Sequence, residues 1–313
     1  MASSEKQRGV VVVGYDGSEH AADALALARL IAAATGDNLL LAAVVPHEFP
    51  YTPGTEHREE AMRTEAAEML ADAVASDGSV ETQVVAGRTA AQGLHDLADS
   101  LNADALVVGS SHHGAIGRVL AGSVALGLLH VAPCPVAVAP VGLAARADAR
   151  LRVVACAVDG SPESLLAMRH AESLARAEGA ALRLLAVHEP ELVFGADVVS
   201  AGYDLKEVTA DARRWFEQIL EVAAASIGPG IDVQRHVLEG SPVNALASAA
   251  ENGIDLLVVG SRQYGPVRRV LLGSVSSGLV RSCPTSLLVV PRAGGDRRQP
   301  APGHSVIPTD AAV

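Results

Sequence analysis

The sequence predicts an α/β protein of two tandem domains, each a doubly wound, five-stranded parallel sheet flanked by helices. Three observations carry this prediction. Short apolar runs typical of strands alternate with longer segments of helical periodicity along the chain. The runs are rich in valine and leucine on both faces, as in strands buried between two layers of helices. The second half repeats the element order of the first, and 313 residues suffice for two domains.

The first domain is expected to span residues 9–141. Ser18 is placed to cap the helix at 19–34. The segment 80–85 alternates polar and apolar residues, which predicts a strand toward an edge of the sheet. The predicted helix 56–75 is charged on one face and carries Met62, Ala66, Met69 and Ala73 on the other. The predicted strands are 10–13, 39–45, 80–85, 106–108 and 135–140, and the predicted helices are 19–34, 56–75, 89–101 and 124–131.

The second domain is expected to span residues 151–292, after an Ala- and Arg-rich linker at 141–150. Its first helix begins with a serine cap, Ser161, followed by Pro162 at the first helical position. Residues 293–313 are polar and rich in Pro, Gly and Arg, which predicts a disordered tail. The predicted strands are 153–158, 182–187, 233–238, 256–259 and 287–290, and the predicted helices are 162–178, 209–225 and 243–251.

Composition excludes several classes of protein. A formal net charge of −12 argues against a nucleic-acid-binding surface. The three cysteines, Cys134, Cys156 and Cys283, give no disulfide framework and are expected to be small buried residues in a reducing compartment. The first apolar run stops at Gly14, too early for a signal-peptide core, and no helical stretch is long enough to span a membrane. We therefore expect a cytoplasmic protein with no membrane partner.

Two glycine-containing loops are the strongest functional signal. Gly109 ends one predicted strand, and Gly122-Ser123 opens the next helix; Gly260 and Gly273-Ser274 repeat this at the same spacing. Loop amides and a helix N-terminus, with its partial positive charge, form a ready site for phosphate, and the serine hydroxyl adds a donor. The alternative is that the glycines only permit a tight strand-to-helix crossover. The two copies with one spacing favour an anion site.

An aspartate follows the first strand of each half, Asp16 and Asp159. The first and fourth strands both have glycine-rich exits, so we place them side by side at the point where strand order reverses, since ligands bind there at the carboxyl ends of parallel strands. Each aspartate is then a candidate for a ribose hydroxyl or a phosphate-bound Mg²⁺. The alternative is an aspartate that hydrogen-bonds its own turn before glycine. Gly14 in the first half stands where the second has Ala157, a bulkier residue expected to crowd a sugar, which favours the first site.

At these residues the chain resembles the universal stress protein family. The family motif is a glycine, two residues, a second glycine, nine residues, then Gly-Ser or Gly-Thr. Both loops match it except at the second glycine, which His112 and Gln263 replace; Gly114 and Gly265 stand nearby. The resemblance extends to the aspartate after the first strand, to a valine ending the second strand, and to the closing Cys-Pro strand. It covers roughly residues 9–140 and 151–291.

The resemblance implies a Rossmann-like fold of the adenine-nucleotide alpha-hydrolase type, and binding of ATP or a related adenine nucleotide, with Mg²⁺ as a possible companion. Val44 and Val187, which end the second strand of each half, would contact adenine through backbone amide and carbonyl; from the sequence alone they are core residues. Arg118, Arg268 and Arg269 are weaker candidates for neutralising phosphate. The first-domain candidates are Gly14, Asp16, Val44, Gly109, Ser110, His112, Gly114, Gly122, Ser123 and Val124. The second-domain candidates are Asp159, Val187, Gly260, Ser261, Arg262, Gly273, Ser274 and Val275.

No catalytic residue is assigned. The sequence has no P-loop, no Gly-x-Ser-x-Gly and no kinase catalytic loop. His112, His113 and His130 lack further ligands at metal spacing, so no metal site is expected. The resemblance implies a regulatory stress-response module with at most slow ATP hydrolysis. The alternatives are a protein-interaction module that no longer binds nucleotide and an adenine-nucleotide hydrolase. The closing strands resemble the family's dimerisation edge, which predicts pairing between the two domains, between two chains, or both.

Overall fold

The computed structural model describes residues 8–46, 55–75, 77–111, 118–189, 205–261 and 273–291. Every predicted strand and helix is present within these ranges, with ends displaced by a few residues at most. The first half contains β1 Val10–Gly14, α1 Glu19–Thr35, β2 Asn38–Pro46, α2 Thr55–Ala73, β3 Glu81–Gly87, α3 Ala90–Leu101, β4 Ala105–Gly109, α4 Ser123–Val131 and β5 Val136–Ala139. The second contains β6 Val153–Ala157, α5 Pro162–Glu178, β7 Ala181–His188, α8 Leu205–Ala225, β8 Val233–Glu239, α9 Pro242–Ala250, β9 Leu256–Gly260, α10 Ser274–Leu279 and β10 Ser286–Val290.

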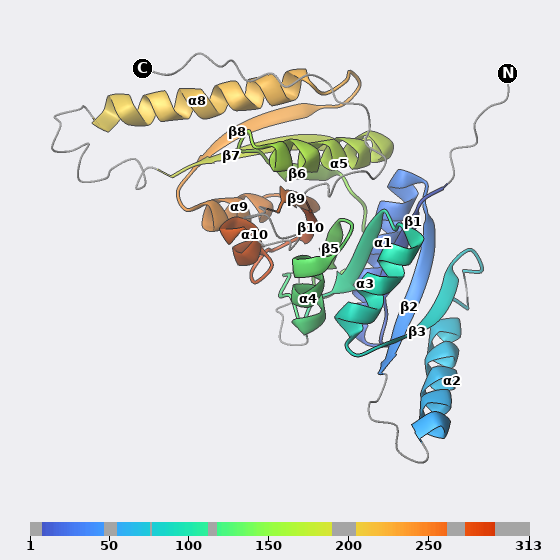
Figure 1. Ribbon diagram of the computed structural model, residues 1–313. Coiled ribbons are helices and arrows are strands. Elements are labelled where there is room, and N and C mark those ends of the chain that lie inside the picture. Colours follow the sequence, from blue (N-terminus) through green and yellow to red (C-terminus); the bar gives the residue numbers. More distant parts are fainter. Residues whose placement is uncertain are drawn as a thin grey trace.

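The strands form one continuous sheet in the order β3-β2-β1-β4-β5-β10-β9-β6-β7-β8 (Figure 1). Within each half all five strands are parallel, as predicted. The first strand pairs with the fourth, and the alternating strand β3 lies at an edge, so both placements are confirmed. Strand order therefore reverses at β1 and again at β6, where ligand crevices are expected.

The two halves join through their closing strands. β5 and β10 pair antiparallel, with Leu287 opposite Val138 and Val289 opposite Val136. This confirms the predicted pairing between domains within one chain. Each closing strand now has a neighbour on both sides, β4 and β10 for β5, and β9 and β5 for β10. The edge through which a second chain was predicted to pair is thus already filled by the chain itself.

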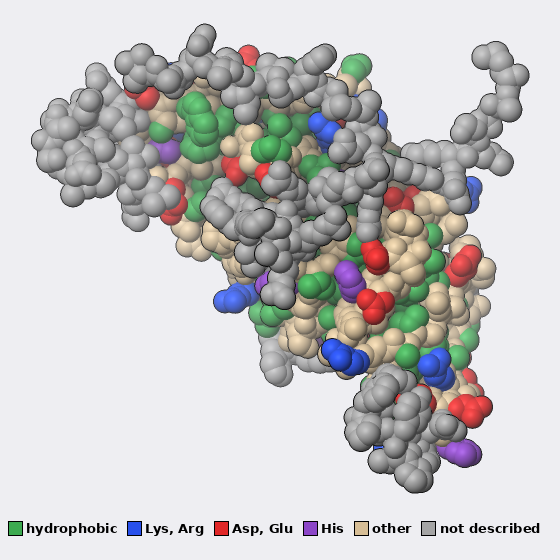
Figure 2. Space-filling view, in the orientation of Figure 1, with side chains coloured by type: hydrophobic (Ala, Val, Ile, Leu, Met, Phe, Trp, Pro, Cys, Tyr) green, Lys and Arg blue, Asp and Glu red, His purple; other side chains and the backbone are tan. Residues whose placement is uncertain are grey.

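Helices cover both faces of the sheet, and each layer encloses a core shared by the two halves. One core packs beneath α1, α2, α5 and α8, and the other beneath α3, α4, α9 and α10 (Figure 1). Both consist mainly of alanine, valine and leucine. The three cysteines are buried, as predicted, and form no disulfide; burial raises the pKa of Cys283 to about 11. On the face drawn in Figure 2 the described basic side chains lie scattered among acidic and apolar ones.

The linker is fixed to the first half by a buried aspartate that the sequence did not single out. Asp23 lies on α1 with 3 % of its surface exposed. Its two carboxylate oxygens accept hydrogen bonds from the amides of Gly142 (2.8 Å) and Ala144 (2.7 Å). Gly142 has a φ of +83°, a conformation that favours glycine. The segment 141–150 is therefore a docked connection in this structure.

Replacing Asp23 with alanine is expected to lower the free energy of unfolding by about 1–3 kcal/mol, because two backbone amides lose charged acceptors. Amide hydrogen exchange at Gly142 and Ala144 should accelerate in the same variant. Asp72→Ala, on the exposed face of α2, is the control, with an expected change of about 0.5 kcal/mol or less. Equal stability of the two variants in urea denaturation would contradict the anchoring role.

Candidate functional site

A cavity of about 690 Å³ lies in the first half, at the carboxyl ends of β1, β2 and β4. This volume lies within the range of small-molecule sites in proteins. Its walls are the strand ends, the inner face of α2, and the first turns of α3 and α4. It sits at the predicted switch point. Eight of the ten first-domain candidates lie around it: Gly14, Asp16, Val44, Gly109, Ser110, Gly122, Ser123 and Val124.

The end of β2 presents free backbone groups to this cavity. Pairing between β1 and β2 stops at Gly14 and Ala42, after which the amide of Tyr15 donates to the carbonyl of Ala42 (2.9 Å). β2 continues to Pro46. Alternate residues of a strand direct their amide and carbonyl to the same side, so those of Val44 face the space beyond the end of β1. This geometry suits the predicted backbone contact with a base, although the valine side chain packs partly into the core.

Asp16 lines the cavity and also organises its own turn. Its Oδ1 accepts from the amide of Ser18 (3.1 Å) and from the Ser18 hydroxyl (2.6 Å). Ser18 in turn caps α1 by accepting from the amide of Ala21 (3.2 Å), as predicted. Gly17, with a φ of +78°, completes the turn. The turn role of this aspartate is therefore present, and its position at the cavity leaves the ligand role open.

The corresponding turn of the second half has the same construction. Asp159 accepts from the amide (3.0 Å) and hydroxyl (2.5 Å) of Ser161, and Ser161 caps α5. Pro162 occupies the first turn, as predicted. The turn is thus a repeated structural unit, independent of what either half binds.

The glycines divide into those that packing requires and one that it does not. A β-carbon on Gly109 would lie 2.1 Å from the carbonyl oxygen of His20 in α1, and one on Gly260 would lie 2.8 Å from that of Glu163. These two glycines allow a helix to cross tightly over a strand end, which supports the alternative interpretation for them. Gly122 differs. Its β-carbon would come no closer than 3.7 Å to any atom, and its φ is −76°.

Packing alone requires a glycine at position 14. A β-carbon there would lie 2.7 Å from Leu94 Cδ1 and 3.3 Å from Val108 Cγ1. A side chain at this position is therefore already excluded by Leu94 of α3 and Val108 of β4, two residues that line the same cavity. Because of this, the contrast between Gly14 and Ala157 does not by itself distinguish the two sites.

The N-terminus of α4 opens on the cavity without a side-chain cap. Gly122 is the capping residue and offers no side-chain acceptor, so the first amides of α4 have no such partner. Ser123 is exposed at the first helical position. Ser110, by contrast, is buried, and its hydroxyl donates to the carbonyl of Ala139 (2.6 Å) and accepts from the amide of Leu120 (3.2 Å). Its hydroxyl hydrogen is thus committed to holding the loop on β5.

Several predicted residues lie outside the described ranges: His112, Gly114, Arg262, Gln263, Gly265, Arg268 and Arg269. Arg118 is described, and its guanidinium pairs with Glu251 of the second half (2.6 Å) rather than facing the cavity. Among the second-half candidates, Ser261 is buried, and its hydroxyl has no hydrogen-bond partner within the described chain. The described residues contain no cluster of three or more potential metal ligands.

Sequence reasoning missed the contribution of α2. Met62, Ala66 and Met69 were predicted to face the core, and they also line the cavity, as does Glu65. A helical periodicity identifies the inner face of a helix, but it does not show that this face extends past the last strand residue. The small side chain of Ala66 on that face was the feature of the sequence that could have indicated space for a ligand beside α2.

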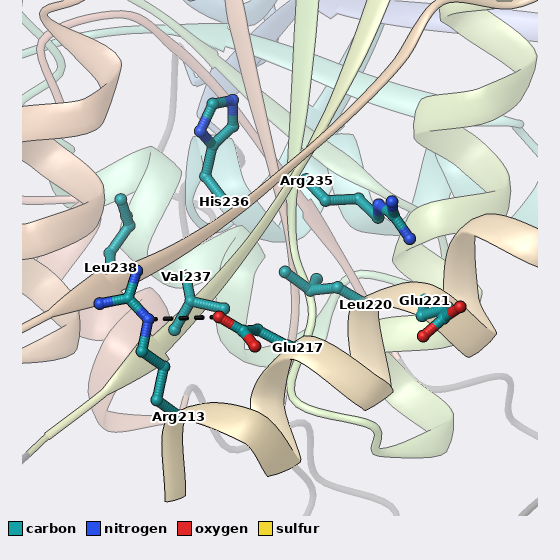
Figure 3. A pocket seen from close by; sticks show the side chains of 8 residues that line it. All are labelled: Arg213, Glu217, Leu220, Glu221, Arg235, His236, Val237 and Leu238. Carbon is teal, nitrogen blue, oxygen red and sulfur yellow. Dashed lines mark hydrogen bonds and ion pairs between the residues drawn. The ribbon is translucent and has the colours of Figure 1, made fainter. Parts of the chain in front are cut away.

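A second hollow, of about 490 Å³, lies between α8 and the edge strand β8 (Figure 3). Within it Arg213 pairs with Glu217 (3.2 Å), and the same guanidinium also contacts Glu239 (3.1 Å). It is away from the strand ends at which the repeated loops lie. We therefore assign the candidate site to the cavity at β1, β2 and β4.

Fold and site together define a tandem protein of the doubly wound α/β class, with a ligand cavity at a topological switch point. Comparison with known proteins gives the family. The model described as "Universal stress protein family" matches residues 8–140 and again residues 150–291. The chain therefore belongs to the universal stress protein family and contains two copies of its domain.

Its relatives have the same tandem length. Universal stress protein Rv2319c of Mycobacterium tuberculosis is 31% identical over 300 residues, covering 90% of this chain and 99% of the relative. Universal stress protein Rv2005c of the same organism is 31% identical over 310 residues, covering 92% and 99%. The crystal structure of a universal stress protein from Archaeoglobus fulgidus superposes with a TM-score of 0.64 at 22% identity, covering 91% of this chain and 99% of that one. In the described part of the chain, no helix is both long and apolar enough to cross a membrane.

Proposed function

We propose that the first half binds ATP or a related adenine nucleotide in its cavity. The observation that carries this proposal is Gly122. Packing does not require a glycine at this position, yet it stands at the uncapped N-terminus of α4 and borders the cavity. A glycine there leaves the helix amides open to an anion, and the helix dipole favours the negative charge of a phosphate.

The remaining walls suit the other parts of the nucleotide. The phosphates would lie at Gly122 and Ser123, and the ribose near Asp16. The base would lie against β2, where the amide and carbonyl of Val44 face the cavity and α2 supplies Met69 as an apolar wall. A Mg²⁺ ion would be held chiefly by the phosphate oxygens, since the described residues supply no cluster of metal ligands of their own.

The role we propose is regulatory, in the cytoplasm and without efficient catalysis. A bound nucleotide adds charge and contacts between α2, α4 and the strand ends, and so biases the surface that these elements present to a partner. The first rival is an interaction module that binds no nucleotide. The second is a slow hydrolase, for which the carboxylates at the cavity, Asp16 and Glu65, are the candidate bases.

Calorimetric titration of the full chain with Mg-ATP tests the proposal. Gly122→Ala should lower the affinity at least tenfold, about 1.4 kcal/mol, while leaving the thermal midpoint unchanged. Gly78→Ala, at an open position in the turn before β3, is the matched control and should bind as the parent does. Equal affinity of the two variants would refute the placement of the phosphates.

Two other outcomes would favour the rivals. If the parent chain shows no binding at millimolar ATP, the interaction module is the better description. If nucleotide is turned over steadily, and Asp16→Ala abolishes the turnover, the hydrolase is. A flat time course for product release is the result expected here.

A further inference from the structure

We propose that the chain binds one nucleotide, in the first half only, because the second half fills the base end of its own crevice with His188 and Phe216. This inference rests on the proposed function. It concerns the strand ends and α8, all of which are described, and it follows from comparing equivalent positions in the two halves.

The sheet register establishes the first equivalence, between Val45 and His188. In each half the first residue after the first strand donates to the second strand, Tyr15 to Ala42 (2.9 Å) and Val158 to Leu185 (2.8 Å). Val45 and His188 each lie three residues beyond that acceptor. Val45 lines the cavity of the first half. His188 therefore occupies a cavity-lining position in the second.

The helices establish the second equivalence, between Ala66 and Phe216. The turn glycine of each half approaches one side chain of the covering helix: Gly17 approaches Met69, and Gly160 approaches Ile219. The next residue on each helix is a fully buried leucine. Three positions before the approached residue stands Ala66 on α2 and Phe216 on α8. An alanine that lines the first cavity is thus replaced by a phenylalanine.

His188 and Phe216 meet across the space that is open in the first half. Their ring centroids are 6.1 Å apart, with the planes inclined by 54°. His188 is 1 % exposed at the end of β7, and Phe216 is partly buried against the hydrophobic core beneath α8. Two rings now span the distance between strand end and helix. A base entering from this end would have to displace both of them.

His188 is held there by packing rather than by hydrogen bonds. Neither ring nitrogen has a hydrogen-bond partner among the described residues. A buried polar atom without a partner costs stability, about 1–3 kcal/mol in mutational data. The histidine therefore lowers stability at this position, and no hydrogen bond from its ring to the described residues offsets that loss. His188→Val, which introduces the residue found at the equivalent Val45 of the first half, is expected to raise the thermal midpoint.

Trp215 makes the inference testable in the full chain. It is the only tryptophan of the sequence, it lies edge-on to Phe216 with ring centroids 4.8 Å apart, and its position corresponds to Glu65 at the mouth of the first cavity. Titration with Mg-ATP should give one site per chain by calorimetry, with no change in tryptophan emission up to saturation. Gly122→Ala should weaken that single binding event at least tenfold.

The outcomes separate the two proposals. Two sites per chain, or a saturable change in Trp215 emission, would overturn the one-site inference while leaving the proposed function intact. No binding at all would refute the proposed function, and the one-site inference with it. Binding in the second half that is lost in His188→Val would show that the unpartnered nitrogens serve a ligand, and would also overturn the inference.

A gain-of-binding variant tests whether His188 and Phe216 are what blocks the second crevice. Phe216→Ala with His188→Val, placed in the Gly122→Ala background, should add one binding event and couple it to Trp215 emission. Val222→Ala, at an exposed position on α8, is the matched control in that background and should not gain this event. If the double substitution folds, as judged by its thermal unfolding, but gains no binding event, then these two side chains are not the block.

Discussion

Replacing Gly109 with alanine is expected to lower the free energy of unfolding by about 3 kcal/mol or more, the upper range for overpacking a core. The added β-carbon would lie 2.1 Å from the carbonyl oxygen of His20 and 2.6 Å from its carbonyl carbon. Both atoms belong to the backbone of α1, so no side-chain rotation relieves the clash. Either α1 or the end of β4 has to move, and each is packed on the central strands.

The same substitution at two other glycines gives losses of unfolding free energy with which that of Gly109→Ala can be compared. Gly260→Ala places its β-carbon 2.8 Å from the equivalent backbone oxygen and should cost less than Gly109→Ala. Gly122→Ala brings its β-carbon no closer than 3.7 Å to Ser111, an ordinary van der Waals contact, and should change stability by about 0.5 kcal/mol or less. Urea denaturation of the three variants should rank them in this order. A Gly109→Ala protein as stable as Gly122→Ala would show that the helix and strand are farther apart in solution.

Truncating Leu287 to alanine is expected to cost about 2–5 kcal/mol, the range measured for fully buried leucines. Leu287 is 0 % exposed and lies opposite Val138 in the antiparallel joint between the halves. The cavity left behind borders side chains from both domains, which cannot close on it without shifting the sheet. Leu101→Ala, at a residue 40 % exposed at the end of α3, should cost less than about 1 kcal/mol.

The form of the unfolding curve is part of this second prediction. Each core cluster includes residues of both halves, so the chain should unfold in one transition, and Leu287→Ala should shift all of it. Circular dichroism and Trp215 fluorescence, followed in the same denaturation, should coincide. A separate early transition seen only by Trp215 would show that the second half unfolds by itself.

The sequence was sufficient for the fold because strand and helix periods are local properties. The valine run of β1, the alternation of β3 and the serine caps of α1 and α5 each specify their element without reference to the rest of the chain. The position of β1 beside β4 followed from the glycine exits. The pairing of the two halves into one continuous sheet was only one of two predicted arrangements; the other was pairing between two chains. The sequence could not choose between them, because whether Val138 lies opposite Leu287 of the same chain or of a second chain depends on distances between segments far apart in sequence.

For the site, the sequence identified the strand ends but not what faces them. It placed Asp16, Val44 and Gly122 correctly at one crevice, because parallel strands end together. It assigned Gly14 and Gly109 to the same crevice, which they line, but it did not show that their missing β-carbons also make room for Leu94 and for α1. The direction of a β-carbon depends on tertiary packing. For the same reason Phe216 counted only as one more apolar residue in a helix, and His188 as the residue after a strand.

The joint between β5 and β10 has a consequence for how the two halves can differ. In a dimer of identical chains, every substitution appears at both sites, so a side chain that closes one crevice closes the other. Here the same pairing is made between two copies of unequal sequence on one chain, and the association of the halves does not depend on protein concentration. A substitution in this chain therefore changes one crevice and leaves the other as it was. The chain can keep one half open to a ligand and use the other as a permanently docked scaffold.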